Sequence, residues 1–565
     1  MKTFGKIVLV ILGIVLALQV LGLVVVYYSR RIAPNTVLTM RIAGDIQEQA
    51  PQYPLTDLLV GTPATVTDIV EGLDRARSDP RITGVELRIT ESTMNMAKIQ
   101  EVRDKIREFN RAGKFSVAYL EFATNQSYYL ASACQTVLLL PQSLLYIHGM
   151  MASTTFLRGT LDKLGIYPDL YHIGEYKNAM NVFTEKKYTP AHREAVQALL
   201  GEWYQEYVQG VAQSRGLKPA EVKQLIEQGP FASEEARRAK LVDQAAYWDE
   251  ARDLVRTKNH GSDRRLDLRA YLDRTGSETR HKLAVIYATG TILPGRSGDS
   301  PAGGQVMGSD TIAEQFRRAR EDDGVRAVIL RVDSPGGAVF PSEVIRREVE
   351  ITRRQKPVVV SMSDVAASGG YWIATSADRI VAEPGTITGS IGVVTGKYNL
   401  HGLFDKLGLS EDLVATTENA TLDWPFQNFT PAQRQSVQKN MRDIYESFLA
   451  RVAEGRHMKV GDVDKIGQGR VWTGEQAFRL GLVDELGGLD TAIARARKLA
   501  KIPAQEKTSL LLLPPRRAFL ERLLDLFGEA RFLSAGAAPG TWLRSLECLA
   551  RQPAWAILPG VPEVE

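Results

Sequence analysis

One serine stands directly before two glycines in the stretch DVAASGGYWIAT, residues 364–375. This serine, Ser368, could be the nucleophile of a covalent hydrolytic mechanism, or only a small residue in a tight turn. A serine hydroxyl attacks a carbonyl carbon when a base removes its proton. No histidine lies close to Ser368 in the sequence, so its base has to come from a distant part of the chain.

A second glycine-rich turn, DSPGG at residues 333–337, follows the apolar run GVRAVILRV. A tetrahedral intermediate needs backbone N–H groups that point at its oxyanion, and glycines allow the backbone to approach a substrate closely. We therefore predict that Gly337 and Gly369 donate these hydrogen bonds. The alternative for both motifs is an ordinary turn without a chemical role.

The chain contains an internal repeat. The segment IVEGLDRARSDPRITGVELRI from Ile69 matches IAEQFRRAREDDGVRAVILRV from Ile312, at an offset of 243 residues. Later blocks keep this offset, and those that follow Thr189 keep an offset of 241. Because chance does not hold one offset over many blocks, the sequence predicts a duplicated domain, and two units are too few for a solenoid.

The two copies differ at the residues that could do chemistry. Opposite Ser368-Gly369-Gly370 the first copy has Asn125-Gln126-Ser127, and opposite DSPGG it has TESTM. The first copy has a lysine of its own, Lys177 in GEYKNA. Its counterpart in the second copy is Ala420 or a residue within two positions of it, since the offset changes by two nearby. None of the possible partners in the second copy is a lysine, so nucleophile and base would come from different copies.

A lysine can serve as the base of a serine if its amine is neutral. The pKa would have to fall by about 3 from ~10.4, which corresponds to ~4 kcal/mol. Burial of the lysine in a dry cleft between two domains could lower its pKa by this amount. Lys163, Lys186 and Lys187 lie close to Lys177 in the sequence and are the alternative bases.

Each copy alternates strand-like and helix-like segments. In the second copy GVRAVILRV and KPVVVSM are typical of buried parallel strands, GGYWIATSAD of a helix and RIVAEP of a third strand. This alternation predicts an α/β sheet with right-handed crossovers. Thr430 and Thr473 are predicted N-caps. Residues 257–281 have the polar composition of a linker, and residues 293–310 that of a mobile loop.

Composition narrows the possible partners. With 70 basic and 66 acidic residues the formal net charge is +4, which gives no reason to expect nucleic-acid binding. Cys134 and Cys548 are the two cysteines, too few for a disulfide framework or a zinc site. We expect no metal and no cofactor.

The N-terminus predicts a membrane anchor. Residues Ile7–Tyr28 contain no charge over 22 positions, and a helix of that length spans about 33 Å, enough for a bilayer. A cleaved signal peptide and a buried helix are the alternatives. The predicted domains are therefore an anchor at 1–35, a lysine-bearing domain at 36–278, a serine-bearing domain at 279–504 and an extension of open role at 505–565.

Four motifs, DSPGGAVFPSE, AASGGYWIAT, TGSIGV and GEYKNA, together resemble the signal peptide peptidase A family in its long two-domain bacterial form. The resemblance covers the chain from the anchor to about residue 500. It implies tandem duplicated crotonase/ClpP-like α/β domains after a single N-terminal transmembrane helix. It also implies a membrane-anchored serine endopeptidase with a Ser-Lys dyad, which degrades cleaved signal peptides and other apolar extended peptides.

The motifs of that family assign roles to three side chains of this sequence. Ser368 takes the place of the nucleophile, Lys177 that of the general base, and Ser390 in TGSIGV that of a serine whose hydroxyl helps to hold the lysine. The alternative for Ser390 is a turn residue. The resemblance further implies a bowl-shaped homotetramer without cofactors, with its catalytic domains on the periplasmic side of the bacterial cytoplasmic (inner) membrane.

Two other functions are compatible with such a fold. An acyl-CoA enzyme of the crotonase type would use the glycine turns for a thioester and would require a CoA substrate. A non-catalytic membrane scaffold would tolerate Ser368→Ala without effect. The peptidase hypothesis instead predicts that the two domains are inactive when they are expressed separately. It also predicts that the substrate pairs as an extended strand beside DSPGG and that small or apolar residues occupy the S1 pocket.

Overall fold

The computed structural model describes residues 31–49, 64–276, 279–299, 304–515, 555–557 and 563–564. Within these ranges no helix combines the length and the apolar character that a membrane crossing requires. The predicted anchor, Ile7–Tyr28, lies outside the described residues, and so do Cys548 and most of the predicted extension at 505–565.

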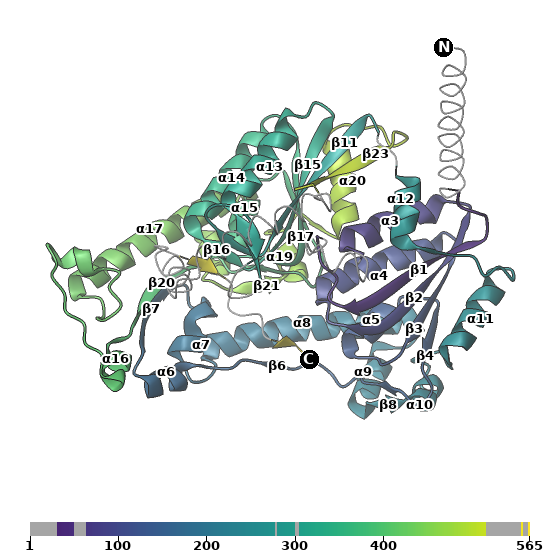
Figure 1. Ribbon diagram of the computed structural model, residues 1–565, viewed down its shortest axis with the longest axis horizontal. Helices are drawn as coiled ribbons and strands as arrows, with labels where there is room; N and C mark the ends of the chain where they lie inside the picture. Colours follow the sequence, from purple (N-terminus) through teal and green to yellow (C-terminus); the bar gives the residue numbers. More distant parts are fainter. Residues whose placement is uncertain are drawn as a thin grey trace, which may run out of the picture.

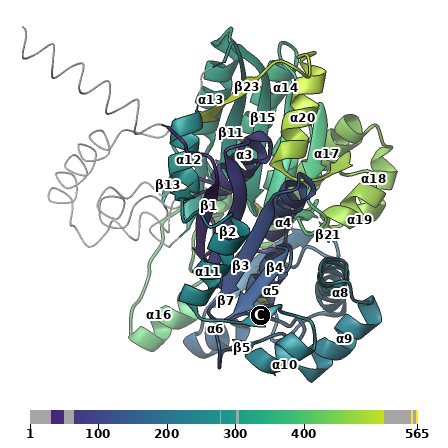
Figure 2. The same ribbon diagram turned by 90° about the vertical axis from the view of Figure 1, so that its right-hand side faces the viewer.

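A six-stranded parallel sheet forms the centre of the first copy (Figures 1 and 2). Its strands, in sheet order, are β10 (Arg265–Asp267), β1 (Thr36–Gly44), β2 (Ile82–Ser92), β3 (Phe115–Leu120), β4 (Thr136–Leu139) and β9 (Gln244–Ala245). Apolar side chains such as Val85, Leu87 and Ile89 of β2 are fully buried, as expected for a sheet covered on both faces. Helices α3 (Val66–Ser78) and α4 (Met96–Arg111) contact each other beside this sheet.

The second copy repeats this architecture in a sheet of eight strands. Its main path, in sheet order, is β21 (Val471–Thr473), β19 (Ile387–Gly389), β17 (Val358–Ala367), β15 (Val325–Ser334), β11 (His281–Thr289) and β23 (Thr508–Leu513). Strand β18 (Arg379–Ala382) pairs with β17 and with β22 (Glu485–Leu486).

The sequence repeat reappears element by element. Helix α5 (Asn125–Ala131) of the first copy matches α15 (Gly369–Ala374) of the second, at the offset of 243. Helix α8 (Pro190–Arg215) matches α17 (Pro431–Arg456) at the offset of 241. The predicted caps Thr430 and Thr473 are confirmed, because the side chain of each accepts a backbone N–H at the start of its helix.

Two segments fold where the sequence predicted irregular chain. Residues 257–281 are not a linker, because β10 and α12 (Leu268–Thr275) lie within them and Leu268 and Tyr271 are buried against the first core. A few apolar residues among many charges were enough to anchor them. Residues 293–310 contain an antiparallel pair, β13 (Gly298–Asp299) and β14 (Gln305–Gly308), where a mobile loop was expected.

The second sheet also extends past residue 504, the predicted end of the second domain. Strand β23 pairs in parallel with β11 over six residues, from His281↔Thr508 to Ile286↔Leu513. Leu513 is fully buried in the second core. Strand β23 is the counterpart of β10, which pairs in parallel with β1 at the offset of 243. The predicted boundary at 504 therefore falls before the last strand of the second copy.

A third sheet joins the two copies. Strand β7 (Tyr167–Ile173) of the first copy pairs antiparallel with β20 (Val393–Asn399) of the second, seen side by side in Figure 1. The sheet order is β13-β14-β12-β16-β24-β20-β7, with β12 (Thr291–Leu293), β16 (Gly336–Ala338) and β24 (Trp555–Ile557) at its centre. Two short strands, β25 (Glu563–Val564) and β6 (Ala152–Ser153), form a separate pair.

Buried ion pairs cross the boundary between the copies. The fully buried guanidinium of Arg331 on β15 donates to Glu48 at 2.9 Å and to Glu101 of α4 at 2.7 Å. Helix α4 itself contacts both β3 and β17, so it is shared by the two sheets. A buried ion pair is costly to break when one partner is removed, since the other charge stays desolvated. The two copies are therefore fixed to each other by more than the covalent chain.

Candidate active site

Ser368 lies at the turn between the buried strand β17 and helix α15. Its backbone has φ 55° and ψ −113°, a conformation that non-glycine residues adopt at an energetic cost and that clusters at functional sites. The turn is held on both sides, since the Ser368 N–H donates to Gly389 O and its carbonyl accepts from Trp372 N, each at 2.8 Å. The side chain of Ser368 is thus placed by a fixed backbone.

Lys177 of the first copy reaches this serine within the same chain. The residue precedes the short 3₁₀ helix η1 (Asn178–Met180), and its Nζ lies 2.6 Å from Ser368 Oγ. Lys177 has no solvent-exposed surface, and neither has Ser368. The other candidate lysines are not in this site: Lys186, for example, forms an ion pair with Asp162 and is 68% exposed.

Ser390 supplies the other two polar partners of the lysine. Lys177 Nζ lies 3.0 Å from both the carbonyl oxygen and Oγ of Ser390. Ser390 also has a positive φ, of 53°, and its N–H donates to Arg470 O at 2.7 Å. A neutral amine has two N–H donors and one lone pair. It can therefore donate to both Ser390 oxygens and accept the proton of the Ser368 hydroxyl.

Burial lowers the pKa of Lys177 well below its ordinary value, since an ammonium ion loses its hydration there. The three contacts of its amine are to two serine hydroxyls and one carbonyl, which carry no formal charge to stabilise the ammonium form. The site therefore favours the neutral amine, the form that can accept a proton.

Close backbone contacts bring the two copies together at the lysine. Gly469, with φ +73°, is so near that an added Cβ would lie 2.4 Å from Lys177 Cβ. Gly174, with φ +105°, would place a Cβ 2.3 Å from the carbonyl carbon of Gln468. The Tyr176 N–H donates to Gln468 O at 2.8 Å. Gly469 was not predicted as a site residue. In the sequence it is only the second glycine of GQGR, residues 467–470.

The two glycine turns named as oxyanion donors contact each other. A Cβ on Gly370 would lie 2.7 Å from the carbonyl oxygen of Ser334, and α15 contacts β16. Gly369 is the first residue of α15, where a backbone N–H has no acceptor within the helix. Gly337 lies in β16, against the backbone of Ile292. The motifs SPGG and SGG thus form adjacent parts of one site.

A charge cluster formed by the buried Lys98 with Asp45, Asp333 and the buried Asp364 lies beside these turns. Lys98 Nζ is 3.4 Å from a carboxylate oxygen of each aspartate. Burial raises the pKa of Asp364 to about 7, against the opposing effect of Lys98. Asp333 begins DSPGG and Asp364 begins DVAASGG, so both stood inside the quoted motifs, yet their partner Lys98 comes from the other copy and gave no signal in sequence.

The described residues were also compared with the requirements of a metal site. Across the part of the chain that the structure describes, no three His, Cys, Asp or Glu side chains are grouped so that they could hold a metal ion. Cys134 is buried and free, and burial raises the pKa of its thiol to about 12.

Comparison with known proteins is consistent with this geometry. The model of peptidase family S49 matches residues 108–260 and again 350–503. The chain is 32% identical to the chloroplastic serine protease SPPA of Arabidopsis thaliana, covering 89% of this chain and 75% of that one. It is 36% identical to Protease 4 of Salmonella typhi, covering 77% and 72%. It is also 34% identical to a putative signal peptide peptidase SppA of Enterococcus faecium, over 33% and 55%.

Proposed function

This chain belongs to peptidase family S49 and is a serine-type endopeptidase, and we propose that Ser368 is its nucleophile and Lys177 its general base. The observation that carries this assignment is the contact of 2.6 Å between Lys177 Nζ and Ser368 Oγ in a site without solvent exposure. The geometry fits proton transfer, since a base has to lie within about 2.6–3.2 Å of the proton donor.

The proposed reaction proceeds through an acyl-enzyme. Lys177 Nζ takes the proton of the Ser368 hydroxyl while Oγ bonds to the carbonyl carbon of the substrate, whose oxygen becomes negative. The N–H groups of Gly337 and Gly369 stabilise this oxyanion. The lysine then returns the proton to the leaving amine, the C–N bond breaks, and a water molecule hydrolyses the ester by the same sequence of proton transfers. Ser390 keeps the amine in place throughout.

The substrate is proposed to bind as an extended strand beside DSPGG. Support comes from the chain itself, because β24 lies antiparallel to β16 with Gly337↔Ala556 in register, and its Trp555 also pairs with Val394 of β20. A position bordered by two strands offers main-chain hydrogen bonds on both sides to any extended peptide. The pairing of β24 supports this proposed position, and a substrate that binds there would have to displace β24.

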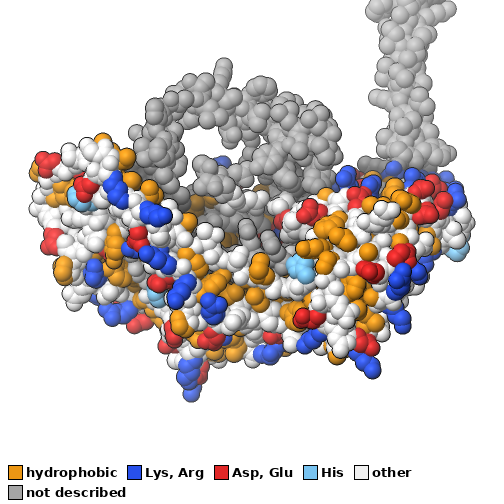
Figure 3. All heavy atoms as spheres, turned by 90° about the horizontal axis from the view of Figure 1, so that it is seen from below, with side chains coloured by type: hydrophobic (Ala, Val, Ile, Leu, Met, Phe, Trp, Pro, Cys, Tyr) orange, Lys and Arg blue, Asp and Glu red, His pale blue; other side chains and the backbone are white. Residues whose placement is uncertain are grey.

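Cleaved signal peptides are the proposed substrates, together with other apolar peptides. The putative signal peptide peptidase among the relatives favours this class, and so does the predicted anchor at Ile7–Tyr28, which would hold the enzyme where such peptides remain after secretion. We place the catalytic domains on the periplasmic side of the cytoplasmic membrane. The face shown in Figure 3 mixes acidic and basic side chains, which fits a peptide rather than a nucleic-acid partner.

A head-to-tail homotetramer is the proposed assembly. The repeat maps β20 onto residues 150–156 and β7 onto residues 410–416. Residues 410–416 form no strand and are exposed, with Val414 98% exposed. If they paired with residues 150–156 of a second copy, the β7–β20 contact would recur between subunits. Heterologous contacts of this kind close into a ring when the rotation between neighbouring subunits closes. Light scattering of Val414→Asp should then show smaller species than the wild type.

Cleavage of defined peptides tests the proposed substrate class. Leucine-rich peptides derived from a signal sequence are incubated with the purified full chain, and the products are identified by mass spectrometry. We expect cleavage after small or apolar residues, because Ser368 and Lys177 are buried and the contacts of the lysine amine carry no formal charge. A profile dominated by charged residues before the cleaved bond would contradict the proposal, and so would a requirement for a CoA thioester.

A further inference from the structure

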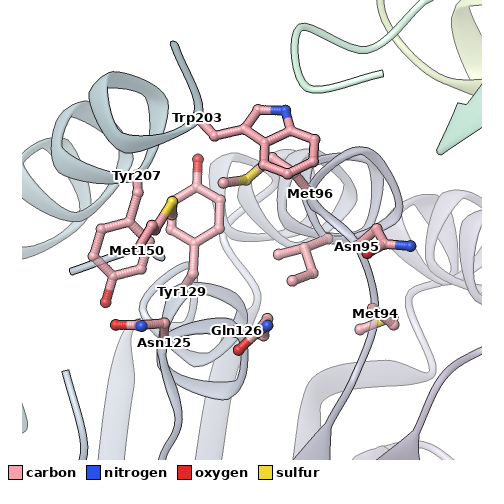
Figure 4. A pocket seen from close by; sticks show the side chains of 10 residues that line it. Met94, Asn95, Met96, Asn125, Gln126, Tyr129, Met150, Trp203 and Tyr207 are labelled. Carbon is pink, nitrogen blue, oxygen red and sulfur yellow. The ribbon is translucent and has the colours of Figure 1, made fainter. Parts of the chain in front are cut away.

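The first copy contains a pocket at the place where the second copy has its serine. The cavity measures about 40 Å³, more than the roughly 10–15 Å³ that one water needs. Helix α5 begins at Asn125, which occupies the position of Ser368 in the repeat. The apolar part of its wall includes Ile99 and the labelled side chains of Met96, Tyr129, Met150, Trp203 and Tyr207 in Figure 4.

The walls of this first-copy pocket reproduce part of the catalytic copy. Tyr129 and Tyr207 pack with their ring centroids 5.2 Å apart. Their counterparts in the repeat, Trp372 and Phe448, pack at 4.5 Å. The aromatic pair beside the site is therefore present in both copies, whereas the nucleophile is present in one.

Two residues that line the pocket each have a buried polar atom without a hydrogen-bond partner. Asn125 donates through Nδ2 to Gly149 O at 2.8 Å, but its Oδ1 is unpaired, and so is the hydroxyl of Tyr207. Asn125 is 6% exposed and Tyr207 is 2% exposed. Leaving such groups unpaired in a protein interior is energetically unfavourable. An acceptor and a hydroxyl donor together complement the N–H and C=O of a peptide group.

We propose that the first-copy pocket is a non-catalytic peptide-binding site. It would take one apolar side chain of an extended peptide, while Asn125 Oδ1 accepts a peptide N–H and the Tyr207 hydroxyl donates to a peptide carbonyl. This inference rests on the proposed function, because it assumes that the substrates are apolar peptides. Each chain would then hold peptide at two sites and cleave it at one. Among the lining residues Asn95 is exposed and Gln126 is half-buried.

Photo-crosslinking locates this site directly. The full chain with Ser368→Ala is mixed with a leucine-rich peptide that carries a diazirine analogue of leucine, irradiated and digested for mass spectrometry. We expect crosslinks in two regions, one around β16 and one at residues 94–99, 150 or 203. Tyr207→Phe removes only the unpaired hydroxyl, so we expect peptide affinity at the first-copy pocket to fall about 3- to 10-fold, while the unfolding temperature does not fall.

Tyr128→Phe is the matched control. The Tyr128 hydroxyl is buried in the same copy but donates to Leu241 O at 2.8 Å. Its loss should lower the unfolding temperature without changing the crosslinks at the pocket. Labelling confined to the second copy, or equal labelling of the pocket in Tyr207→Phe, would overturn the inference while leaving the proposed function intact. If the chain with Ser368 cleaves no peptide and neither region is labelled, the proposed function itself fails.

Discussion

Lys177 Nζ lies 2.6 Å from Ser368 Oγ, although the two residues are 191 positions apart and belong to different copies of the repeat. The contact forms within one chain. It depends on the antiparallel pairing of β7 with β20, which carries the loop containing Lys177 from the first copy into the second. The duplication thus divided one site between two domains, and neither domain alone contains both side chains.

The pH dependence of cleavage should report on the lysine. Because burial lowers the pKa of Lys177, the neutral base is formed at a pH well below ~10.4, the value of a free lysine. We expect kcat to rise with pH through this lowered pKa and then to level off. The measurement is kcat over a pH series with one apolar peptide. A rate that keeps rising tenfold per pH unit up to pH 10 would contradict a lowered pKa.

Lys177 should also lower the stability of the fold. Its folded-state pKa is below the unfolded value, so the unfolded chain binds more protons between these two values and stability rises with pH across that interval. Lys177→Met cannot be protonated, so we expect the variant to lack this slope and to unfold at a higher temperature than wild type at neutral pH. Thermal unfolding at several pH values checks this, and an equal slope in both proteins would refute it.

Gly469→Ala should disturb the position of the lysine. The new Cβ would lie 2.4 Å from Lys177 Cβ, and we expect kcat to fall at least tenfold, since small misplacements of a base are costly. Gly216→Ala is the matched control, because Gly216 has a similar φ of +65° with nothing within 4 Å. Both variants should lose about 1 kcal/mol of stability from backbone strain, and Gly469→Ala should lose more because of its clash with Lys177. Similar kcat values for the two variants would argue against the contact.

The C-terminal strand should compete with substrate. A chain that ends at residue 515 keeps β23 but lacks β24, which occupies the proposed substrate position. We expect its kcat/KM for apolar peptides to rise about threefold or more, because the open site is populated more often. A chain that ends at residue 504 also lacks β23 and the buried Leu513, so we expect it to unfold at a lower temperature. Unchanged kcat/KM in the first truncation would show that β24 does not block the site.

Several features of the fold and the site were accessible from sequence, each through a repeated or local signal. The repeat offset predicted the two α/β copies, and the copy-specific motifs pointed to Ser368, Lys177, Gly337 and Gly369. Helix caps such as Thr430 were readable because a cap depends on neighbouring residues alone.

What sequence could not show was contact between distant segments. The Lys98 cluster joins three aspartates from both copies, and Gly469 matters only because Lys177 approaches it. Strand β23 corresponds to β10 of the first copy, but residues 265–267 and 508–510 share no residue at the offset of 243, so the sequence repeat gave no sign of it. The orphaned atoms of Asn125 and Tyr207 likewise become visible only when neighbours from α5 and α8 are placed together.

The most direct test of the central claim is peptidase activity of three full-length proteins: wild type, Ser368→Ala and Lys177→Met, each checked for folding by circular dichroism. The proposed mechanism predicts that Ser368→Ala loses at least ~10³-fold in kcat and that Lys177→Met loses at least ~10²-fold, with folded spectra for both. Cleavage by folded Ser368→Ala at the wild-type rate would contradict the nucleophile. Cleavage by folded Lys177→Met at the wild-type rate would contradict the assignment of Lys177 as the general base.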